Sequence, residues 1–121
     1  MSTRANIILR DAEGNRLCVY HHYDGYLKGV GRKLERILHS IPSVTISQSA
    51  TVSEVSPSGI PNTLQGLADY LHSQDELFEP GFEVADPEYI YEINLSTRRV
   101  HWFHVNCCTG DILDQGFLCE Y

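Results

Sequence analysis

A short apolar segment near the start of the chain, residues 5–10 (ANIILR), places the strongest constraint on the fold. Its composition favours a strand, and its apolar residues do not alternate strictly with polar ones, so we expect both faces of this strand to be at least partly covered. Residues 11–15 (DAEGN) have the composition of a turn, and residues 16–22 (RLCVYHH) favour a second strand. The sequence therefore predicts a β-hairpin at this point.

Two later segments carry apolar residues at helical spacing. Residues 31–40 have one apolar stripe and a basic exposed face, and Pro42 ends the pattern. The second segment begins at Asn62, which forms a capping-box arrangement with Gln65, and ends near Gln74. These patterns predict two amphipathic helices.

The last third of the chain predicts three strands. Residues 89–95 and 99–105 (RVHWFHV) form a second hairpin, and residues 112–121 supply a final strand that Gly116 interrupts. The order ββ-α-α-βββ is typical of an α+β fold, with a mostly antiparallel sheet and two helices packed on one face.

The length of 121 residues suits one domain that spans residues 1–121. Residues 43–60 are rich in Ser and Thr, and their pattern fits either a loop or a weak edge strand. As a loop of this length, the segment would be a candidate lid or partner-binding element.

The charge distribution limits the partners of the protein. The formal net charge is −7, and residues 69–92 contain many acids but no Lys or Arg. An acidic chain repels a phosphate backbone, so general nucleic-acid binding is not expected. The apolar run from Ile7 to Leu9 is too short for a signal-peptide core or a membrane span, so we expect a cytoplasmic protein that does not bind membranes.

The four cysteines, Cys18, Cys107, Cys108 and Cys119, are expected to be reduced thiols. Cys107 and Cys108 would point to opposite faces if they lay on a strand, so we expect ordinary buried thiols there. His101 and His104 precede them, but the region has no Cys-x-x-Cys pair. No metal site and no cofactor are therefore predicted.

The turn after the first hairpin carries the best candidate site. His22 and Asp24 could form a pair in which the carboxylate orients the imidazole, and Tyr26 could add a hydroxyl. Two glycines and nearby cations at the start of the first helix could bind a phosphate or carboxylate through free backbone amides. The alternative is a purely structural turn with packed tyrosines. The candidate catalytic residues are His22, Asp24 and Tyr26, and the candidate anion-binding residues are Lys28, Gly29, Gly31, Arg32 and Lys33.

Two stretches resemble a known group of proteins. Residues 2–7 (STRANI), followed by the pattern Tyr20-x-His22-x-Asp24-Gly25-Tyr26 and then Gly29-x-Gly31, resemble small proteins carried by bacteriophages, prophages and bacterial genomes. Those proteins usually have a proline after the Asp-Gly-Tyr, where this chain has Leu27. No activity comes with the resemblance; it implies a cytoplasmic accessory protein that interferes with a host system or supports phage replication.

The leading functional expectation is a non-enzymatic binding protein that acts through a host protein or a small anionic, nucleotide-like ligand. Asp75, Glu76 and Glu79 are the candidate contacts for a protein partner, because they lie in the acidic segment. The alternative is a small hydrolase or phosphodiesterase that uses His22 and Asp24. A homodimer through an open face or edge of the sheet is a further expectation.

Overall fold

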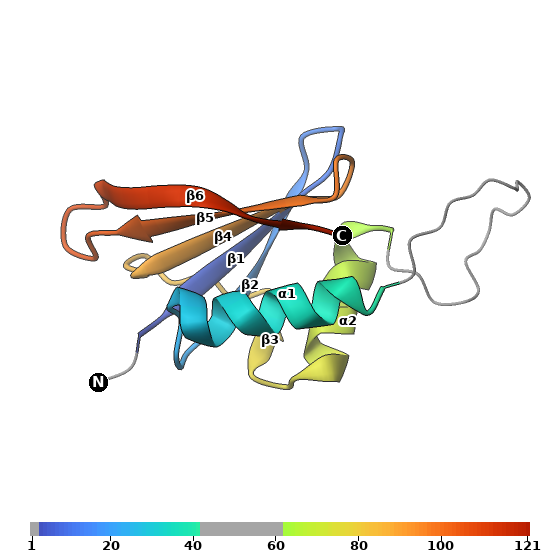
Figure 1. Ribbon diagram of the computed structural model, residues 1–121, viewed down its shortest axis with the longest axis horizontal. Helices are drawn as coiled ribbons and strands as arrows, with labels where there is room; N and C mark the ends of the chain where they lie inside the picture. Colours follow the sequence, from blue (N-terminus) through green and yellow to red (C-terminus); the bar gives the residue numbers. More distant parts are fainter. Residues whose placement is uncertain (1–2, 42–61) are drawn as a thin grey trace, which may run out of the picture.

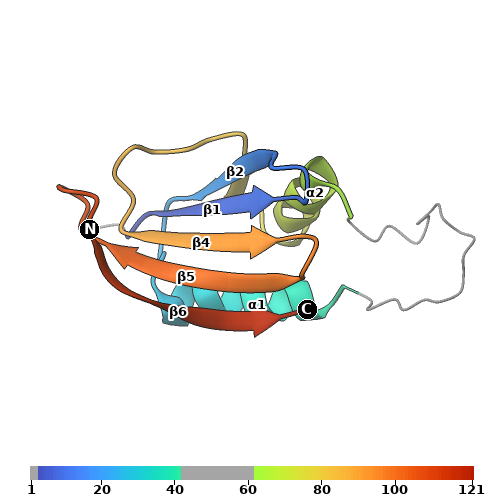
Figure 2. The same ribbon diagram turned by 90° about the horizontal axis from the view of Figure 1, so that it is seen from above.

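A computed structural model describes residues 3–41 and 62–121, so the segment 43–60 lies outside the described residues. The described chain forms a single six-stranded sheet with two α-helices on one of its faces (Figures 1 and 2). The strands lie in the order β3-β2-β1-β4-β5-β6. The elements are β1 (Ala5–Arg10), β2 (Arg16–His21), α1 (Arg32–His39), α2 (Leu64–Gln74), β3 (Phe78–Pro80), β4 (Tyr89–Asn94), β5 (Arg99–Val105) and β6 (Ile112–Glu120), and one wide helical turn, η1 (Leu27–Gly31), precedes α1.

The two predicted hairpins are present, but the sheet is mixed rather than mostly antiparallel. β1 pairs antiparallel with β2, and β4 pairs antiparallel with β5. The two hairpins meet through β1 and β4, which run parallel with Ala5 opposite Tyr89. The amide of Glu88 donates to the Arg4 carbonyl at 3.0 Å, so the chain re-enters the sheet beside the start of β1. Both strands therefore run in the same direction.

β3 is a strand that the sequence pattern did not predict. It contains three residues and pairs antiparallel with β2, with Phe78 opposite His21. Three residues are too few for an alternating pattern to be detected. The element order is therefore ββ-α-α-ββββ rather than ββ-α-α-βββ.

The core lies between the sheet and the helices. Ile7 and Leu9 of β1, Tyr91 and Ile93 of β4, and Leu34 of α1 are all fully buried there. The opposite face of β1 is covered as well, as predicted, because Ile8 and Asn6 are also buried. The first strand lies in the interior of the sheet, which explains why its apolar residues do not alternate with exposed ones.

The cap of the second helix differs from the prediction. Thr63 is the N-cap, and its Oγ1 accepts a hydrogen bond from the Gly66 amide at 3.0 Å. Gln65 instead donates to the carboxylate of Asp69 at 2.9 Å. The capping box of Asn62 and Gln65 is therefore wrong, because the helix begins one residue later and Thr63 supplies the oxygen.

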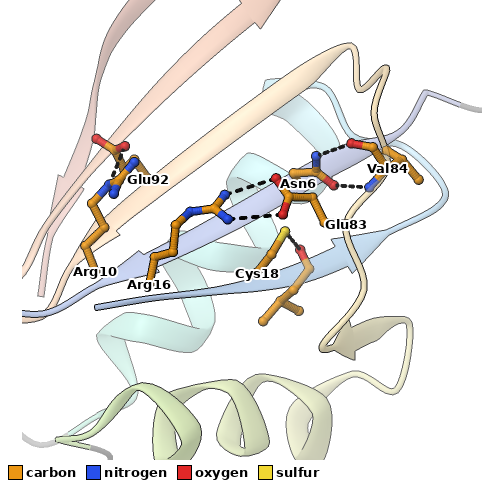
Figure 3. Close-up of polar contacts among 8 residues, drawn as sticks. Asn6, Arg10, Arg16, Cys18, Glu83, Val84 and Glu92 are labelled. Atoms are coloured by element: carbon orange, nitrogen blue, oxygen red, sulfur yellow. Dashed lines mark hydrogen bonds and ion pairs between the residues drawn. The ribbon is translucent and has the colours of Figure 1, made fainter. Parts of the chain in front are cut away.

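Residues 81–88, which we call the outer strap, run across β1 and β2 on the face opposite the helices (Figure 3). The side chain of Asn6 donates to the Val84 carbonyl at 2.9 Å and accepts from the Val84 amide at 3.2 Å. Arg16 forms a bidentate ion pair with Glu83, with hydrogen bonds of 3.0 and 3.1 Å. The acids of this strap are thus partly neutralised by arginines of the first hairpin.

Two further arginines, Arg4 just before β1 and Arg10 at the end of β1, also pair with acids. Arg4 lies 3.0 Å from Asp86, and Arg10 lies 2.8 Å from Glu92. The acidic run between residues 69 and 92 is therefore not one continuous negative surface. Within the described part of the chain, no helix has both the length and the apolar character needed to span a bilayer.

Candidate functional site

The predicted pair of His22 and Asp24 is not made. Nδ1 of His22 lies 2.6 Å from the hydroxyl of Tyr20. Asp24, which has a φ of 53°, accepts a hydrogen bond from the Tyr26 hydroxyl at 3.1 Å. This bond raises the pKa of Tyr26. Each member of the expected pair is thus bonded to a tyrosine, and neither orients the other.

The glycines of the turn serve close packing. A Cβ on Gly29 would lie 2.1 Å from the carbonyl oxygen of Asp24, and a Cβ on Gly25 would lie 2.9 Å from the carbonyl oxygen of Thr3. The Gly25 carbonyl accepts from the hydroxyl of Tyr91 at 2.7 Å. These positions need glycine because other groups of the protein occupy the space.

The amides that were expected to bind an anion are already bonded. The amides of Gly29 and Gly31 both donate to the Tyr26 carbonyl, at 2.9 and 3.3 Å. The Val30 amide donates to the Asp24 carbonyl at 2.8 Å. The prediction that these backbone amides are free to bind an anion is therefore wrong, because the turn itself uses the donors. Of the predicted cations, Lys28 and Arg32 are exposed, whereas Lys33 points into the fold.

Lys33 connects two groups that the sequence analysis did not combine. Its ammonium donates to Nε2 of His21 at 3.2 Å and to the carboxylate of Asp75 at 2.7 Å. The three residues come from α1, β2 and the turn between α2 and β3. His21 is fully buried and lies against the ring of Phe78, with 4.7 Å between the ring centroids. We call these three residues the His21 cluster.

The protonation states of the His21 cluster follow from its geometry. Burial lowers the pKa of His21 and the charge of Lys33 lowers it further, while Asp75 and Asp24 oppose this only in part. Burial alone would raise the pKa of Asp75, but hydrogen bonds from Lys33 and the Leu77 amide outweigh it and lower the pKa. Because the ammonium donates to Nε2, neutral His21 carries its proton on Nδ1, which has no hydrogen-bond partner within the described residues.

The sequence contained a signal for this cluster. Val19 and His21 share one face of the second strand, and Tyr20 and His22 share the other. The helices cover the face of Val19 and His21, so His21 is the buried histidine. Sequence reasoning favoured His22 because of its spacing from Asp24, and it could not tell which face the helices would cover.

The three predicted partner-binding acids do not form one surface. Asp75 is bonded to Lys33, and its side chain is only 20% exposed. Glu76 is exposed, whereas Glu79 lies on β3 opposite Tyr20, on the other face of the sheet from His21. A partner could not reach all three carboxylates from one side.

The two edges of the sheet differ in strand length and in the exposure of apolar side chains. At one edge, β3 has three residues and ends in Pro80, which makes it a poor template for another strand. At the other edge, β6 has nine residues, and Ile112, Leu113 and Phe117 are 54%, 57% and 52% exposed. Long, apolar edge strands are the kind that pair with another chain.

Two further features describe the β6 edge. His39 of α1 donates to the Glu120 carbonyl at 2.8 Å, so one main-chain acceptor at the C-terminal end of this strand is already used. Phe117 lies against the ring of His101 at 5.6 Å and near the guanidinium of Arg99 at 5.8 Å. The exposed apolar part therefore lies between residues 112 and 117.

The adjacent cysteines are exposed, which corrects the expectation of buried thiols. β5 ends at Val105, so Cys107 and Cys108 lie in the turn between β5 and β6. Contact with Cys108 raises the pKa of Cys107. Cys18 and Cys119 are buried, and burial raises their pKa values to about 12 and about 11.

Comparison with known proteins assigns no function. No protein-family model, no curated protein and no solved structure matches the chain significantly. The function of this chain must therefore be inferred from its own sequence and geometry.

Proposed function

We propose that this protein is a binding protein that acts through a protein partner, and that the partner contacts the β6 edge. One observation carries the proposal: the nine-residue edge strand exposes three large apolar side chains, while the opposite edge is short and ends in proline. An extended segment of a partner could add to this edge through main-chain hydrogen bonds and cover the apolar side chains.

The charge of the edge indicates the kind of partner. Residues 105–121 contain Asp111, Asp114 and Glu120 but no Lys or Arg. Glu120 is paired with Arg99 at 2.9 Å, which leaves the first two acids near the exposed apolar residues. A segment that combines apolar residues with Lys or Arg complements this edge, whereas a second copy of a chain with net charge −7 would be repelled. The resemblance to phage and bacterial proteins supports a host protein as the source of that segment.

The geometry supports the two other expectations less well. A small anion would have to bind through the side chains of Lys28 and Arg32 alone, because the glycine amides are used within the turn. A hydrolase based on His22 and Asp24 would lack the orienting contact between them, because each is bonded to a tyrosine.

Site-specific photocrosslinking tests the proposal. Benzoylphenylalanine is placed at position 117 or, as a control, at position 82, where Phe82 of the outer strap is 60% exposed. The protein is expressed in bacterial cells and irradiated. We expect a discrete crosslinked product from position 117 and none from position 82. In parallel, Asp114→Lys should weaken recovery of the same product, because it reverses charge at the edge.

Three outcomes would contradict the proposal. Equal crosslinking from both positions would indicate non-specific contact with exposed aromatic side chains. A product of twice the mass of this chain would indicate a homodimer. No product from position 117, in a protein whose circular dichroism is unchanged, would remove the β6 edge as a binding surface.

A further inference from the structure

The helix face of the sheet carries a group of aromatic side chains near the β6 edge. Trp102 and His104 share one face of β5 with the buried Val100, so they lie on the side of the helices. Tyr89 of β4 lies opposite His104, and the two rings are stacked, with 4.5 Å between their centroids and 7° between their planes. We call Tyr89, Trp102 and His104 the aromatic platform.

The helices cover the aromatic platform only in part. The C-terminal end of β5 and the beginning of β6 extend past the first helical turn before α1 (Figures 1 and 2). Tyr89 and Trp102 pack against the core, and all three rings of the platform are half-buried. Part of the platform is therefore accessible from the side of the β6 edge.

Trp102 reaches this edge because its neighbour on β6 is a glycine. Gly116 lies opposite Trp102, and a Cβ at Gly116 would lie 2.9 Å from Nε1 of the indole. The indole therefore lies over the Gly116 backbone, in the place that a side chain would take. If a partner strand pairs with β6, its residue opposite Gly116 meets the indole with no β6 side chain between them.

A carboxylate lies beside the indole on the same face of β6. Asp114 is exposed, lies opposite His104, and is two residues from Gly116. Its Oδ1 accepts from the Gln115 amide at 2.9 Å. Among residues 3–41 and 62–121, no Lys, Arg or His forms an ion pair with Asp114. An aromatic ring next to a carboxylate attracts a cation through both the ring face and the charge.

The other face of β6 has an apolar character. Ile112 lies opposite Val105, and Phe117 lies opposite His101. Val105 and His101 alternate with Trp102 and His104 along β5, so Ile112 and Phe117 lie on the face away from the helices. The two faces of this edge strand therefore offer different chemistry to an added strand.

We infer that the partner segment is an alternating strand, with Arg or Lys toward the helix face and apolar side chains toward the opposite face. Its cation opposite Gly116 lies over Trp102 and beside Asp114. Arginine suits this position better than lysine, because a planar guanidinium stacks on an indole and also pairs with a carboxylate. The inference rests on the proposed function, since it concerns the same edge, and it adds the order of side chains in the partner.

Two synthetic peptides of equal composition and charge test this order. In the alternating peptide VRVRVRVR, all arginines lie on one side of a strand; in the block peptide VVVVRRRR, they lie on both sides. Binding is measured by the anisotropy of a fluorescein label. We expect the alternating peptide to bind about tenfold more tightly. Trp102 is the only tryptophan, so the unlabelled alternating peptide should change the tryptophan emission of the protein.

Three variants locate the cation. Asp114→Asn keeps the oxygen that accepts from Gln115 but removes the charge, and it should weaken the alternating peptide about three- to fivefold. Glu13→Gln makes the same change of net charge in the exposed turn between β1 and β2, and it should weaken binding by less than about twofold. Trp102→Leu should remove most of the preference for the alternating peptide. Circular dichroism checks the fold, and Asp114→Asn, a change at an exposed side chain, decides the test if Trp102→Leu does not fold.

The outcomes separate this inference from the proposed function. Equal affinity for the two peptides, or binding without a change in the emission of Trp102, would overturn the alternating order but leave the β6 edge as a binding surface. Equal weakening by Asp114→Asn and Glu13→Gln would assign the attraction to net charge and would also overturn it. If neither peptide binds, the inference fails; the proposed function fails with it only if position 117 also gives no crosslinked product in cells.

Discussion

His21 is the residue whose chemistry is most strongly set by its surroundings. It is fully buried, its Nε2 accepts from Lys33, and burial followed by the charge of Lys33 lowers its pKa below the ordinary value of 6.5. The unfolded chain therefore binds a proton at this residue at a higher pH than the folded chain does. By linkage, the stability that neutral His21 contributes is present above pH 6.5 and is lost as the pH falls below it.

The lowered pKa of His21 leads to a prediction for pH-dependent unfolding. The free energy of unfolding, measured with urea, should decrease as the pH falls below 6.5, before Asp75 protonates below its ordinary value of 3.8. His21→Gln keeps an oxygen that can accept from Lys33 and does not titrate. In this variant the decrease should be smaller. An equal decrease in both proteins would assign the pH dependence to other groups.

Gly29 gives a second prediction at the residue scale. A Cβ at this position would lie 2.1 Å from the Asp24 carbonyl oxygen, which belongs to the backbone and cannot move easily. Gly29→Ala should therefore lower the free energy of unfolding by about 1–3 kcal/mol. At Gly31 the nearest atom would be 3.4 Å away, so Gly31→Ala should change stability by less than about 1 kcal/mol. Equal effects in thermal unfolding would contradict this account of the glycines.

At the scale of elements, the sequence predicted local structure well and non-local pairing poorly. The hairpin of β1 and β2 and the stripe of α1 follow from composition and periodicity within one segment. The parallel pairing of Ala5 with Tyr89 joins residues far apart in the chain, and no local pattern encodes it. The choice between His21 and His22 likewise depended on which face the helices cover, and the exposure of Cys107 depended on where β5 ends.

The outer strap gives a prediction about which contacts hold it on β1 and β2. Asn6 is 3% exposed and bonds both main-chain groups of Val84, so Asn6→Ala would leave a buried donor and acceptor without partners. We expect a loss of about 1–3 kcal/mol and faster hydrogen exchange at the Val84 amide. Arg16→Gln removes the half-exposed pair with Glu83 and should cost less than about 1 kcal/mol. If Arg16→Gln were the more destabilising change, the ion pairs would hold the strap instead of Asn6.

At the scale of the whole molecule, one core joins segments from both ends of the chain. Buried residues of β1, α1, α2, β5 and β6 belong to the same apolar cluster, which includes Ile7, Leu34, Leu67, Val100 and Cys119. Neither half of the sheet has a separate core. The expectation of one domain therefore becomes a prediction that the chain unfolds in a single cooperative transition.

Two probes in different parts of the molecule test this cooperativity. Trp102 is the only tryptophan, and it lies in β5 opposite Gly116 of β6, so its fluorescence follows the C-terminal half of the sheet. The helical circular dichroism follows α1 and α2, which lie against the sheet (Figure 2). The two signals should show the same denaturant midpoint and slope, because loss of either layer exposes the core of the other. An earlier fluorescence transition would show that β5 and β6 detach while the helices stay packed on β1 and β2, and would divide the chain into two folding units.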